Sequence, residues 1–355
     1  MGDLPKLRKK IDEIDDKLLL FLNKRAKIVL EIGKIKQKEN LELHSPIREH
    51  EIFHRLEQEN KGPFSNEIIR TIFREIMSGS LSLEGQLKVA YLGPKATFSH
   101  LACLQKYGNS AHLIPVSQIK DVFQEVEQGS VEYGVVPIEN STDGTVTRTL
   151  DSFVDSNLRI TGEIYLEVHN YLISESSVIE NLKKVYSHPQ PIMQCQRWIE
   201  KHLSHVQIVE VESTAKAAEL CLNNPAAAAI ASELAAKLYG LNILAKRIED
   251  NVHNTTRFLM VSRKPIHRTG RDKTSILFSI KDRIGALSQI LQPFADAKIN
   301  LTKIESRPSK KKPWEYFFFL DLEGHEEDSR VQKALEKLKD YCLFFKVLGS
   351  YPVGN

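Results

Sequence analysis

A basic residue stands on an otherwise apolar stripe near the start of the chain. Between Leu4 and Ile35, apolar side chains recur at alternating spacings of three and four residues, and Arg25 takes one of these positions. A guanidinium among apolar neighbours needs an anionic partner. Lys36 lies about 20° from Arg25 around a helix and ~16 Å along it, so both cations can converge on one anion. Arg8 lies about 100° off Arg25 and would more easily serve a different pocket, such as one on a dimer partner.

Further polar residues follow in the same helical segment. Arg48 and Glu49 open the second helical stretch, and Ser80 and Glu84 share a face of the third because they are four residues apart. The alternative interpretation is a coiled coil whose charged side chains reach solvent. Arg25 argues most strongly against this alternative, because it stands on the apolar stripe itself.

Polar residues also follow the predicted strands of the middle segment. Such residues lie where α/β proteins bind ligands, although helix caps and turns would explain any one of them alone. They are Glu139 and Asn140 after the apolar run 133–138, Ser187 after residues 185–186, Gln194 in the next helix, and Thr256-Arg257-Phe258 at the start of the last strand.

Two short segments near the C-terminus stand at the ends of predicted strands. Gly285-Ala286-Leu287 leads from the first of these strands into a helix, and a glycine there lets a ligand approach the backbone closely. Glu305-Ser306-Arg307-Pro308 ends the next strand, and Trp314-Glu315 lies a few residues further on. A ligand site and an ordinary turn remain open for each segment.

The predicted secondary structure divides the chain into three segments, and the elements of these segments must position the polar residues described above. Residues 1–86 are predicted to be helical only, and a first helix close to 50 Å long cannot bury its stripe alone. It must pair with later helices or with a second copy of the chain. Residues 87–263 alternate short apolar runs, among them 158–173, with amphipathic helices, which predicts an α/β sheet. After a basic linker at 264–273, residues 274–355 follow the order strand, helix, strand, strand, helix, strand, a ferredoxin-like α+β pattern.

Composition narrows the class of protein. The formal charge of +3 gives no overall basic field, so we expect neither nucleic acid nor a membrane surface as a partner. Four widely spaced cysteines argue against a disulfide framework and a zinc site and favour the cytoplasm. No dinucleotide, phosphate-loop or metal-ligand motif appears, and we expect no cofactor and no metal.

The helical segment resembles the AroQ-class chorismate mutases, through Leu7-Arg8, Asn23-Lys24-Arg25, residues 31–36, residues 45–49 and residues 73–80. The resemblance implies an intertwined all-α dimer, with one arginine crossing from the partner subunit. Chorismate is a dianion that rearranges within itself to prephenate, a task suited to cations. Many relatives carry Asp where Ser45 stands, and some carry Gln where Glu84 stands. The pocket residues implied are Arg8, Arg25, Lys36, Arg48, Glu49, Ser80 and Glu84.

Residues 89–261 resemble prephenate dehydratase, through Leu92-Gly93-Pro94, residues 97–100, residues 137–140, residues 186–190 and Thr256-Arg257-Phe258. The resemblance implies a two-lobed, periplasmic-binding-like α/β domain that converts prephenate into phenylpyruvate. Loss of the ring hydroxyl and a carboxylate needs a hydrogen-bond donor and an apolar surround, without a cofactor. Ala96 departs from the family, which usually has Gly there. The site residues implied are Thr256 as the catalytic hydroxyl, with Asn140, Ser187, Gln194, Glu139, Arg257 and Phe258.

The last segment resembles the ACT domains of phenylalanine-sensing dehydratases. The resemblance implies that Gly285, Ala286 and Leu287 bind L-phenylalanine together with Glu305, Ser306, Arg307 and Pro308, between two such domains of a homodimer or higher homo-oligomer. The sequence therefore predicts a bifunctional enzyme of phenylalanine biosynthesis under feedback inhibition. Two alternatives stay open: a dehydratase with a non-catalytic N-terminal dimerisation arm, and a non-enzymatic amino-acid sensor.

Overall fold

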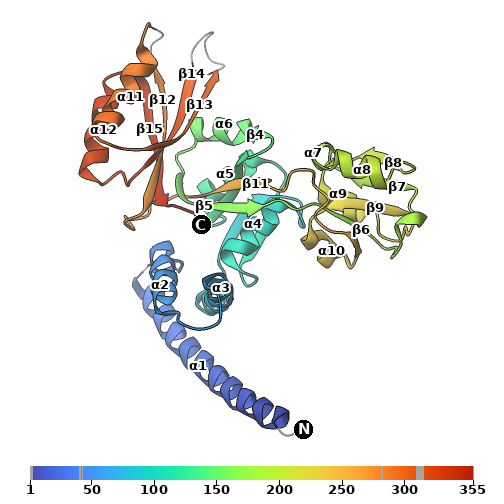
Figure 1. The fold of residues 1–355 in the computed structure, drawn as a ribbon. Coiled ribbons are helices and arrows are strands. Elements are labelled where there is room, and N and C mark those ends of the chain that lie inside the picture. Colours follow the sequence, from blue (N-terminus) through green and yellow to red (C-terminus); the bar gives the residue numbers. More distant parts are fainter. Residues whose placement is uncertain (1–2, 40, 42, 281–282, 309–315, 355) are drawn as a thin grey trace. The chain divides into compact units, whose positions relative to one another are not determined.

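The computed structural model describes residues 3–39, 41, 43–280, 283–308 and 316–354 (Figure 1). The chain forms two compact units. The helical unit comprises Met1–Lys88 and Leu104–His112, and the sheet unit comprises Val89–Cys103 and Leu113–Asn355. Within the described ranges, no helix has the length and apolar character that crossing a bilayer requires.

Three helices make up most of the helical unit: α1 (Leu4–Glu39), α2 (Pro46–Glu59) and α3 (Asn66–Glu84). Ser45 caps α2, where its hydroxyl accepts a hydrogen bond from the Arg48 amide at 3.3 Å, and Pro46 stands in the first turn. Ser65 caps α3 in the same way through the Ile68 amide. The predicted all-helical N-terminal segment is confirmed.

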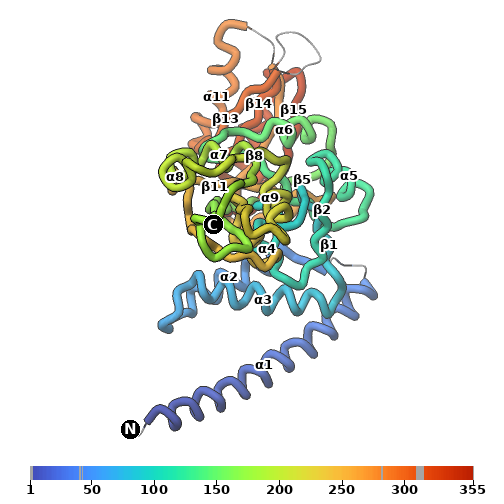
Figure 2. Tube along the Cα trace, turned by 90° about the vertical axis from the view of Figure 1, so that its right-hand side faces the viewer, coloured from blue at the N-terminus to red at the C-terminus, as the bar shows by residue number. Residues whose placement is uncertain are grey.

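The buried face of α1 differs from the predicted apolar stripe. Val29 and Gly33 are the buried residues of this helix, and Arg25 and Lys36 beside them are partly buried. Toward its N-terminus α1 diverges from α2 and α3 (Figures 1 and 2), and the stripe is exposed there, with Leu18, for example, 54% exposed. The first half of the stripe is therefore an uncovered apolar surface on the described chain.

The sheet unit begins with a sheet of six strands. Its order is β2-β1-β3-β11-β5, with β4 paired to β3. β1 and β3 are parallel, whereas β11 is antiparallel to both β3 and β5. The elements of this part are β1 (Lys88–Leu92), α4 (Phe98–Tyr107), β2 (His112–Val116), α5 (Ile119–Gln128), β3 (Tyr133–Asn140), β4 (Gly144–Thr145), α6 (Thr147–Asp155), β5 (Arg159–Glu167) and β11 (Thr255–Ser262).

A second sheet has five strands in the order β10-β6-β9-β7-β8. β7 is parallel to both β8 and β9, and the Ala-rich strand β9 is fully buried. Its elements are β6 (Tyr171–Ser174), η1 (Ile179–Asn181), β7 (Lys184–Ser187), α7 (Pro189–Gln194), α8 (Gln196–His202), β8 (Gln207–Glu210), α9 (Thr214–Glu219), β9 (Ala227–Ala231), α10 (Glu233–Tyr239) and β10 (Asn242–Ala245).

The chain crosses twice between these sheets, once from β5 to β6 and once from β10 back to β11. The apolar run predicted as one piece over 158–173 is therefore two strands in different sheets. Buried Asn170 marks the break, because its backbone N–H donates to Glu249 Oε2 at 2.9 Å instead of to a strand partner. The two crossings produce the predicted two-lobed arrangement.

The C-terminal domain confirms the predicted βαββαβ order. Its sheet runs β13-β14-β12-β15, which leaves β13 at an edge. β12 begins at Asp272, inside the segment predicted to be a linker, because Asp272 and Lys273 are buried in the sheet. The elements are β12 (Asp272–Ile280), α11 (Ala286–Asp296), β13 (Leu301–Pro308), β14 (Tyr316–Glu323), α12 (Ser329–Lys339) and β15 (Cys342–Pro352).

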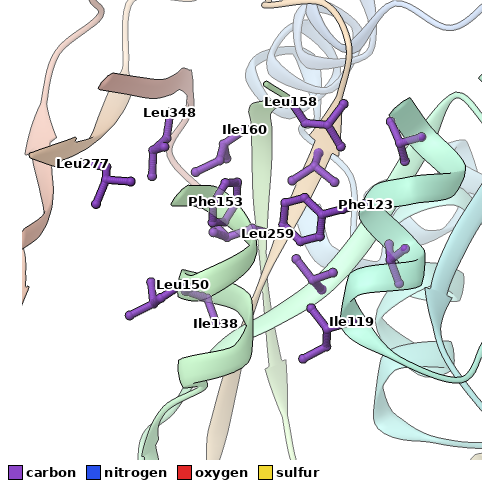
Figure 3. Packing of buried hydrophobic residues seen from close by; sticks show 14 of the residues in the cluster. Ile119, Phe123, Ile138, Leu150, Phe153, Leu158, Ile160, Leu259, Leu277 and Leu348 are labelled. Atoms are coloured by element: carbon purple, nitrogen blue, oxygen red, sulfur yellow. The ribbon is translucent and has the colours of Figure 1, made fainter. Parts of the chain in front are cut away.

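Both faces of β12 are buried, since its side chains alternate between two cores. Ile276 and Phe278 pack with the helices α11 and α12. Leu277 belongs instead to the core of the six-stranded sheet, together with Phe153 and Ile160 (Figure 3). The C-terminal domain thus shares a hydrophobic core with the first lobe.

Candidate active sites

The helical unit contains a partly open cavity of about 390 Å³, lined by α1, α2, α3, the segment that precedes α2 and the end of α4. Six of the seven residues predicted for this pocket line it. They are Arg25, Lys36, Arg48, Glu49, Ser80 and Glu84.

Arg25 and Lys36 extend from α1 toward α3. Arg25 Nη1 donates to Ser80 Oγ, and Lys36 Nζ donates to Glu84 Oε2 at 2.7 Å and to Leu43 O at 2.6 Å. Burial lowers the pKa of Arg25, while the Glu84 carboxylate acts in the opposite direction. A guanidinium has five N–H donors and an ammonium three, so both cations keep donors for a further anion.

Glu49 lies in the first turn of α2, and its side chain is only 13% exposed. His44 Nε2 lies 3.0 Å from Glu49 Oε2, and Lys106 Nζ donates to Oε1 at 3.1 Å. Burial alone would raise the pKa of Glu49, but Lys106 and His44 together lower it to about 2. Arg48 stands at the rim, where it pairs with Glu51 and is 67% exposed.

Arg8 is exposed on the diverging part of α1 and does not line the cavity of its own chain. Seventeen residues separate it from Arg25, a distance of about 26 Å along a helix. The described geometry thus leaves Arg8 exposed and outside the cavity of its own chain.

A second cluster of polar residues forms where β3 ends and β11 begins. Asn140 Nδ2 donates to Thr256 Oγ1 and to Asn254 Oδ1, both at 2.8 Å. The backbone N–H groups of Thr142 and Asp143 donate back to Asn140 Oδ1. Because the Thr256 oxygen accepts from an amide, its own hydrogen can point toward a ligand.

Gln194, the last residue of α7, extends this cluster to the second lobe. Gln194 Oε1 accepts from Asn254 Nδ2 at 3.0 Å and from Asn170 Nδ2 at 3.2 Å, while its Nε2 donates to Asp143 Oδ2 at 2.9 Å. The cluster therefore draws on elements of both sheets, as a site between two lobes requires.

Three other predicted site residues have described contacts or packing outside this cluster. Ser187 is fully buried, and its hydroxyl donates to Ile230 O on β9 at 2.8 Å. Phe258 is 1% exposed within β11. Glu139 forms an ion pair of 2.6 Å with Lys303 of the C-terminal domain.

Arg257 also lies apart from the cluster, because successive strand residues point to opposite faces. Its Nε donates to Glu163 at 2.8 Å, its Nη1 to Asp321 at 2.6 Å and its Nη2 to Tyr351 at 3.0 Å. Burial opposes its charge, but these anionic and hydroxyl partners raise the pKa of Arg257. Lys273 shares Glu163 with it, so two buried cations face two buried anions.

Comparison with known proteins identifies three domains along the chain. The family model for prephenate dehydratase matches residues 89–266, that for chorismate mutase type II residues 7–85, and that for the ACT domain residues 274–340. A bifunctional chorismate mutase/prephenate dehydratase of Aquifex aeolicus (strain VF5) is 54% identical over 356 residues, which cover 99% of this chain and 98% of the relative. This chain belongs to that family.

Two further relatives agree with this assignment. A bifunctional chorismate mutase/prephenate dehydratase of Stutzerimonas stutzeri is 42% identical, over 98% of this chain and 97% of the relative. The crystal structure of a prephenate dehydratase in complex with L-Phe, from Arthrobacter aurescens, is 37% identical with a TM-score of 0.70, over 75% of this chain and 90% of that chain.

The ACT domain directs part of its predicted effector segment toward the dehydratase domain. Glu305 Oε2 accepts from Thr145 Oγ1 at 3.0 Å, and the Arg307 guanidinium donates twice to the Asp151 carboxylate, at 2.5 Å each. Ser306 and Pro308 alternate with these residues on the exposed face of β13.

The other effector segment begins α11. Gly285 caps this helix with a φ of 77°, Ala286 is buried and Leu287 is 43% exposed. The Trp314-Glu315 part of the prediction lies outside the described residues.

Several residues of these sites were not predicted, among them Asn254, Asp143 and Lys106. Asn254 and Asp143 bond Gln194 in the Asn140–Thr256 cluster, and Lys106 contacts Glu49 in the cavity of the helical unit. Asn254 directly precedes the Thr255-Thr256 pair, so its position beside the motif could have indicated it. Asp143 and Lys106 reach their sites through long-range packing, for which the sequence carries no local signal.

Proposed function

We propose that this bifunctional chorismate mutase/prephenate dehydratase rearranges chorismate in the cavity of its helical unit and converts the resulting prephenate to phenylpyruvate at the Asn140–Thr256 cluster. Family membership supports both activities. The residues proposed for each step rest on the geometry of the two sites.

Arg25, Lys36 and Arg48 supply the cations of the mutase step. Chorismate brings two carboxylates, and charge develops on the breaking ether oxygen during rearrangement. Arg25 and Lys36 retain N–H donors after bonding Ser80 and Glu84. Binding a compact conformer between these cations lowers the barrier through orientation and charge stabilisation, without a covalent intermediate.

Thr256 assists the dehydratase step. Its oxygen accepts from Asn140, so its hydrogen is free to bond the departing ring hydroxyl of prephenate. As that hydroxyl leaves with its bonding electrons, the carboxylate bonded directly to the ring leaves as carbon dioxide, and the electron pair of the broken carbon–carbon bond completes the aromatic ring. The pyruvyl side chain keeps its own carboxylate in phenylpyruvate. Asn254 accepts a hydrogen bond from Asn140 and donates one to Gln194 of the second lobe, so Gln194 orients Asn140 through Asn254.

The single observation that carries the dehydratase assignment is this hydrogen-bonded chain from Thr256 through Asn140 and Asn254 to Gln194. The test is to supply chorismate and prephenate separately to the full chain and to follow phenylpyruvate from each. Both substrates should yield phenylpyruvate. Conversion of prephenate alone would identify the helical unit as a dimerisation arm.

L-phenylalanine is the proposed effector of the dehydratase. A relative of known structure contains L-Phe, and the candidate segments here are Gly285–Leu287 and Glu305–Pro308. The edge position of β13 and its exposed alternate residues support a site shared with the ACT domain of a second copy. Calorimetry with L-phenylalanine tests binding, and prephenate turnover tests inhibition.

A homodimer formed through α1 is the proposed assembly. The uncovered apolar stripe on the first half of α1 supports it. The cytoplasm is the proposed compartment, supported by four free cysteines, three of them buried. The proposed domains span residues 1–86, 87–263 and 274–355.

A further inference from the structure

The wall of the mutase cavity includes a segment from beyond the chorismate mutase match. Lys106 and Tyr107 end α4 and line the cavity. They lie within residues 89–266, which match the prephenate dehydratase model, whereas the mutase match ends at residue 85. Yet residues 104–112 belong to the helical unit. The mutase cavity is therefore completed by residues that family membership assigns to the other activity.

Helix α3 holds this segment in place through several polar contacts. Arg74 Nη1 donates to Gln105 O at 2.8 Å, and the Ser110 amide donates to Ser78 Oγ at 3.1 Å. Gly108 has a φ of +72°, and a Cβ there would come within 2.6 Å of the Ser78 side chain. The position of Lys106 at the cavity is thus fixed by its neighbours on both sides.

Lys106 has one described anionic contact, the carboxylate of Glu49. Lys106 Nζ donates to Glu49 Oε1 at 3.1 Å, while His44 occupies Oε2. The side chains of Glu49 and Lys106 are 13% and 26% exposed, so solvent screens the pair only partly. Both carboxylate oxygens of Glu49 are engaged before any substrate enters.

We propose that Lys106 is a positioning residue of the mutase site, which neutralises and orients the Glu49 carboxylate so that a dianionic substrate can bind beside it. The inference rests on the proposed mutase function of the cavity. An ionised carboxylate within a few ångströms of two substrate carboxylates repels them, and the repulsion grows as the site excludes water. A cation paired with Glu49 offsets this repulsion, and Lys106 already makes that pair at 3.1 Å.

Other charged groups around Glu49 also influence the pH at which it binds a proton. His44 contacts it directly, and Lys106 is the cation that α4 contributes. The remaining charged residues that line the same cavity are Arg25 and Lys36 of α1, Arg48 of α2, and Arg74 and Glu84 of α3.

The experiment compares four forms of the full chain with the parent: Lys106→Met, Lys106→Arg, Glu49→Gln and the double variant Glu49→Gln/Lys106→Met. We expect Lys106→Met to raise KM for chorismate about tenfold or more, with a smaller effect on kcat, because the buried carboxylate is left uncompensated. Lys106→Arg should restore KM to within about threefold, since it keeps the charge.

The double variant separates this role from a direct or merely structural one. Once Glu49→Gln has removed the negative charge, adding Lys106→Met should change KM by less than about twofold. An equal increase in KM with and without the Glu49 carboxylate would overturn the proposal, as would an unchanged KM in Lys106→Met.

The pH profile provides a second readout that a structural role would not change. Without Lys106, the buried Glu49 carboxylate binds a proton at higher pH than in the parent, and the protonated form is neutral. KM of Lys106→Met should therefore fall back toward the parent value as pH is lowered from about 7 to 5. If Lys106 does not act through the Glu49 carboxylate, the ratio of the KM of Lys106→Met to that of the parent should not change with pH. That outcome would also count against the proposal.

Two controls keep the test decisive. The first control is prephenate turnover, which reports folding of α4 and should be the same in the Lys106 variants as in the parent. The second is Lys120→Met, which removes an exposed lysine of α5 and should leave KM for chorismate unchanged. If Lys106→Met does not fold, Lys106→Gln gives the same comparison. A parent chain that fails to consume chorismate would refute the mutase function itself. If the parent is active and Lys106→Met has the same KM for chorismate as the parent, only the role of Lys106 is refuted.

Discussion

At the scale of single residues, the orientation of the Thr256 hydroxyl depends on the hydrogen bond that its oxygen accepts from Asn140. Asn140 Nδ2 donates to it at 2.8 Å and simultaneously to Asn254, so the amide cannot rotate without breaking two bonds. Thr256 is 9% exposed, so few waters compete for its hydrogen. An oriented donor in a partly dry site is what departure of hydroxide from prephenate requires.

Replacing Thr256 with Ala should reduce prephenate turnover by about 10²-fold or more, the scale of a lost proton-donating group. Thr256→Ser, which keeps the hydroxyl, should retain most of the rate. The measurement is kcat for phenylpyruvate formation, with Thr255→Ala on the neighbouring strand position as the matched control. Mutase activity should remain at the parent level in all three. A parent-like rate for Thr256→Ala would remove this hydroxyl from the mechanism.

Arg25 is the cation of the mutase cavity that burial affects most clearly, since desolvation lowers its pKa. Arg25→Ala should abolish rearrangement of chorismate, because both its charge and its bond to Ser80 are lost. Prephenate should still be converted, since that site belongs to the sheet unit. Lys27→Ala, an exposed neighbour on α1, is the control for helix stability. Normal chorismate turnover in Arg25→Ala would assign Arg25 a structural role.

Glu49 links the stability of the helical unit to pH. Its pKa is about 2 when folded, against an ordinary carboxyl value of about 4.3. Because the pKa of Glu49 is lower in the folded than in the unfolded chain, its ionised carboxylate stabilises the folded state at pH values above the unfolded pKa. This stabilisation is lost as the pH falls from about 4 to 2. The full effect is of the order of 3 kcal/mol. In Glu49→Gln this part of the acid destabilisation should disappear, as measured by denaturant midpoints of the two chains at pH 6 and pH 3.

Ala96 shows what a residue-level departure from a family pattern can indicate. The resemblance to prephenate dehydratases implied Gly where this sequence carries Ala, and the structure gives this residue a φ of 71°. Left-handed backbone favours glycine, so the family preference has a conformational reason. Here the Ala96 methyl is fully buried in the core of the second sheet, which offsets the strain. Sequence comparison could indicate the strained loop, but not the packing that tolerates it.

At the scale of elements, periodicity predicted which segments are helices and strands better than it predicted their partners. The stripe on α1 was predicted from spacing, but the face that packs on α3 runs through Val29 and Gly33. A Cβ at Gly33 would come within 3.2 Å of Glu84, so the close approach of α1 to α3 depends on a residue 51 positions away in the chain. Such contacts, like those of Asp143 and Lys106, depend on tertiary packing that a local pattern does not contain.

Strand β13 is the element that connects the effector segment with the dehydratase domain. Its alternate residues Lys303, Glu305 and Arg307 contact Glu139, Thr145 and Asp151 in turn. Glu139 directly precedes Asn140 of the Asn140–Thr256 cluster and pairs with Thr145 in the sheet. A shift of β13 on effector binding would therefore be transmitted to the strand that orients Thr256.

Asp151→Asn should weaken feedback inhibition without removing effector binding. The substitution disrupts the bidentate contact with Arg307, and a coupling of 1–3 kcal/mol sets the available range at roughly 5- to 150-fold. We expect the concentration of L-phenylalanine for half-inhibition to rise about fivefold or more. Uninhibited turnover should change less than about twofold, because Asp151 lies on α6 and takes part in none of the contacts described for the Asn140–Thr256 cluster.

Calorimetry distinguishes coupling from binding in this variant. Retained L-phenylalanine binding with weakened inhibition supports transmission through β13. Asp340→Asn at the exposed end of α12 is the matched control. If Asp151→Asn is inhibited like the parent, the contact between Arg307 and Asp151 is not part of the coupling.

At the scale of the whole molecule, a buried charge network joins the dehydratase and ACT domains. Arg257 and Lys273 face Glu163 and Asp321, and Tyr351 bonds Arg257 from the last strand. The charges balance, so removing one leaves a buried neighbour uncompensated. The network also anchors β11 on the face opposite Thr256.

Asp321→Asn should lower the free energy of unfolding of the sheet unit by about 3 kcal/mol, as expected for breaking a buried pair. Adding Lys273→Met restores the balance of charge, so the double variant should lose less than the sum of the single variants. Denaturant unfolding measures both. Additive losses would show that the four groups are not energetically coupled.

The dimer is the level at which the mutase site is complete in the proposed function. The N-terminal half of α1 carries exposed apolar side chains, and Arg8 lies about 26 Å along the helix from Arg25 of its own chain. A two-fold dimer through α1 would bring the Arg8 side chain of each chain toward the cavity of the other. Arg8→Ala and Arg25→Ala should each inactivate the mutase, one by removing the crossing arginine and the other by removing the resident one.

Mixing the two inactive variants should therefore restore activity. In a heterodimer, the Arg8→Ala chain keeps Arg25 and the Arg25→Ala chain keeps Arg8, so one of the two cavities has both arginines. Random exchange of subunits makes half of the dimers heterodimers, which predicts about a quarter of the parent mutase activity. The variants are unfolded together, refolded and assayed with chorismate, and each variant refolded alone is the control. If Arg8 acted within its own chain, every cavity in the mixture would lack one arginine and no activity would return.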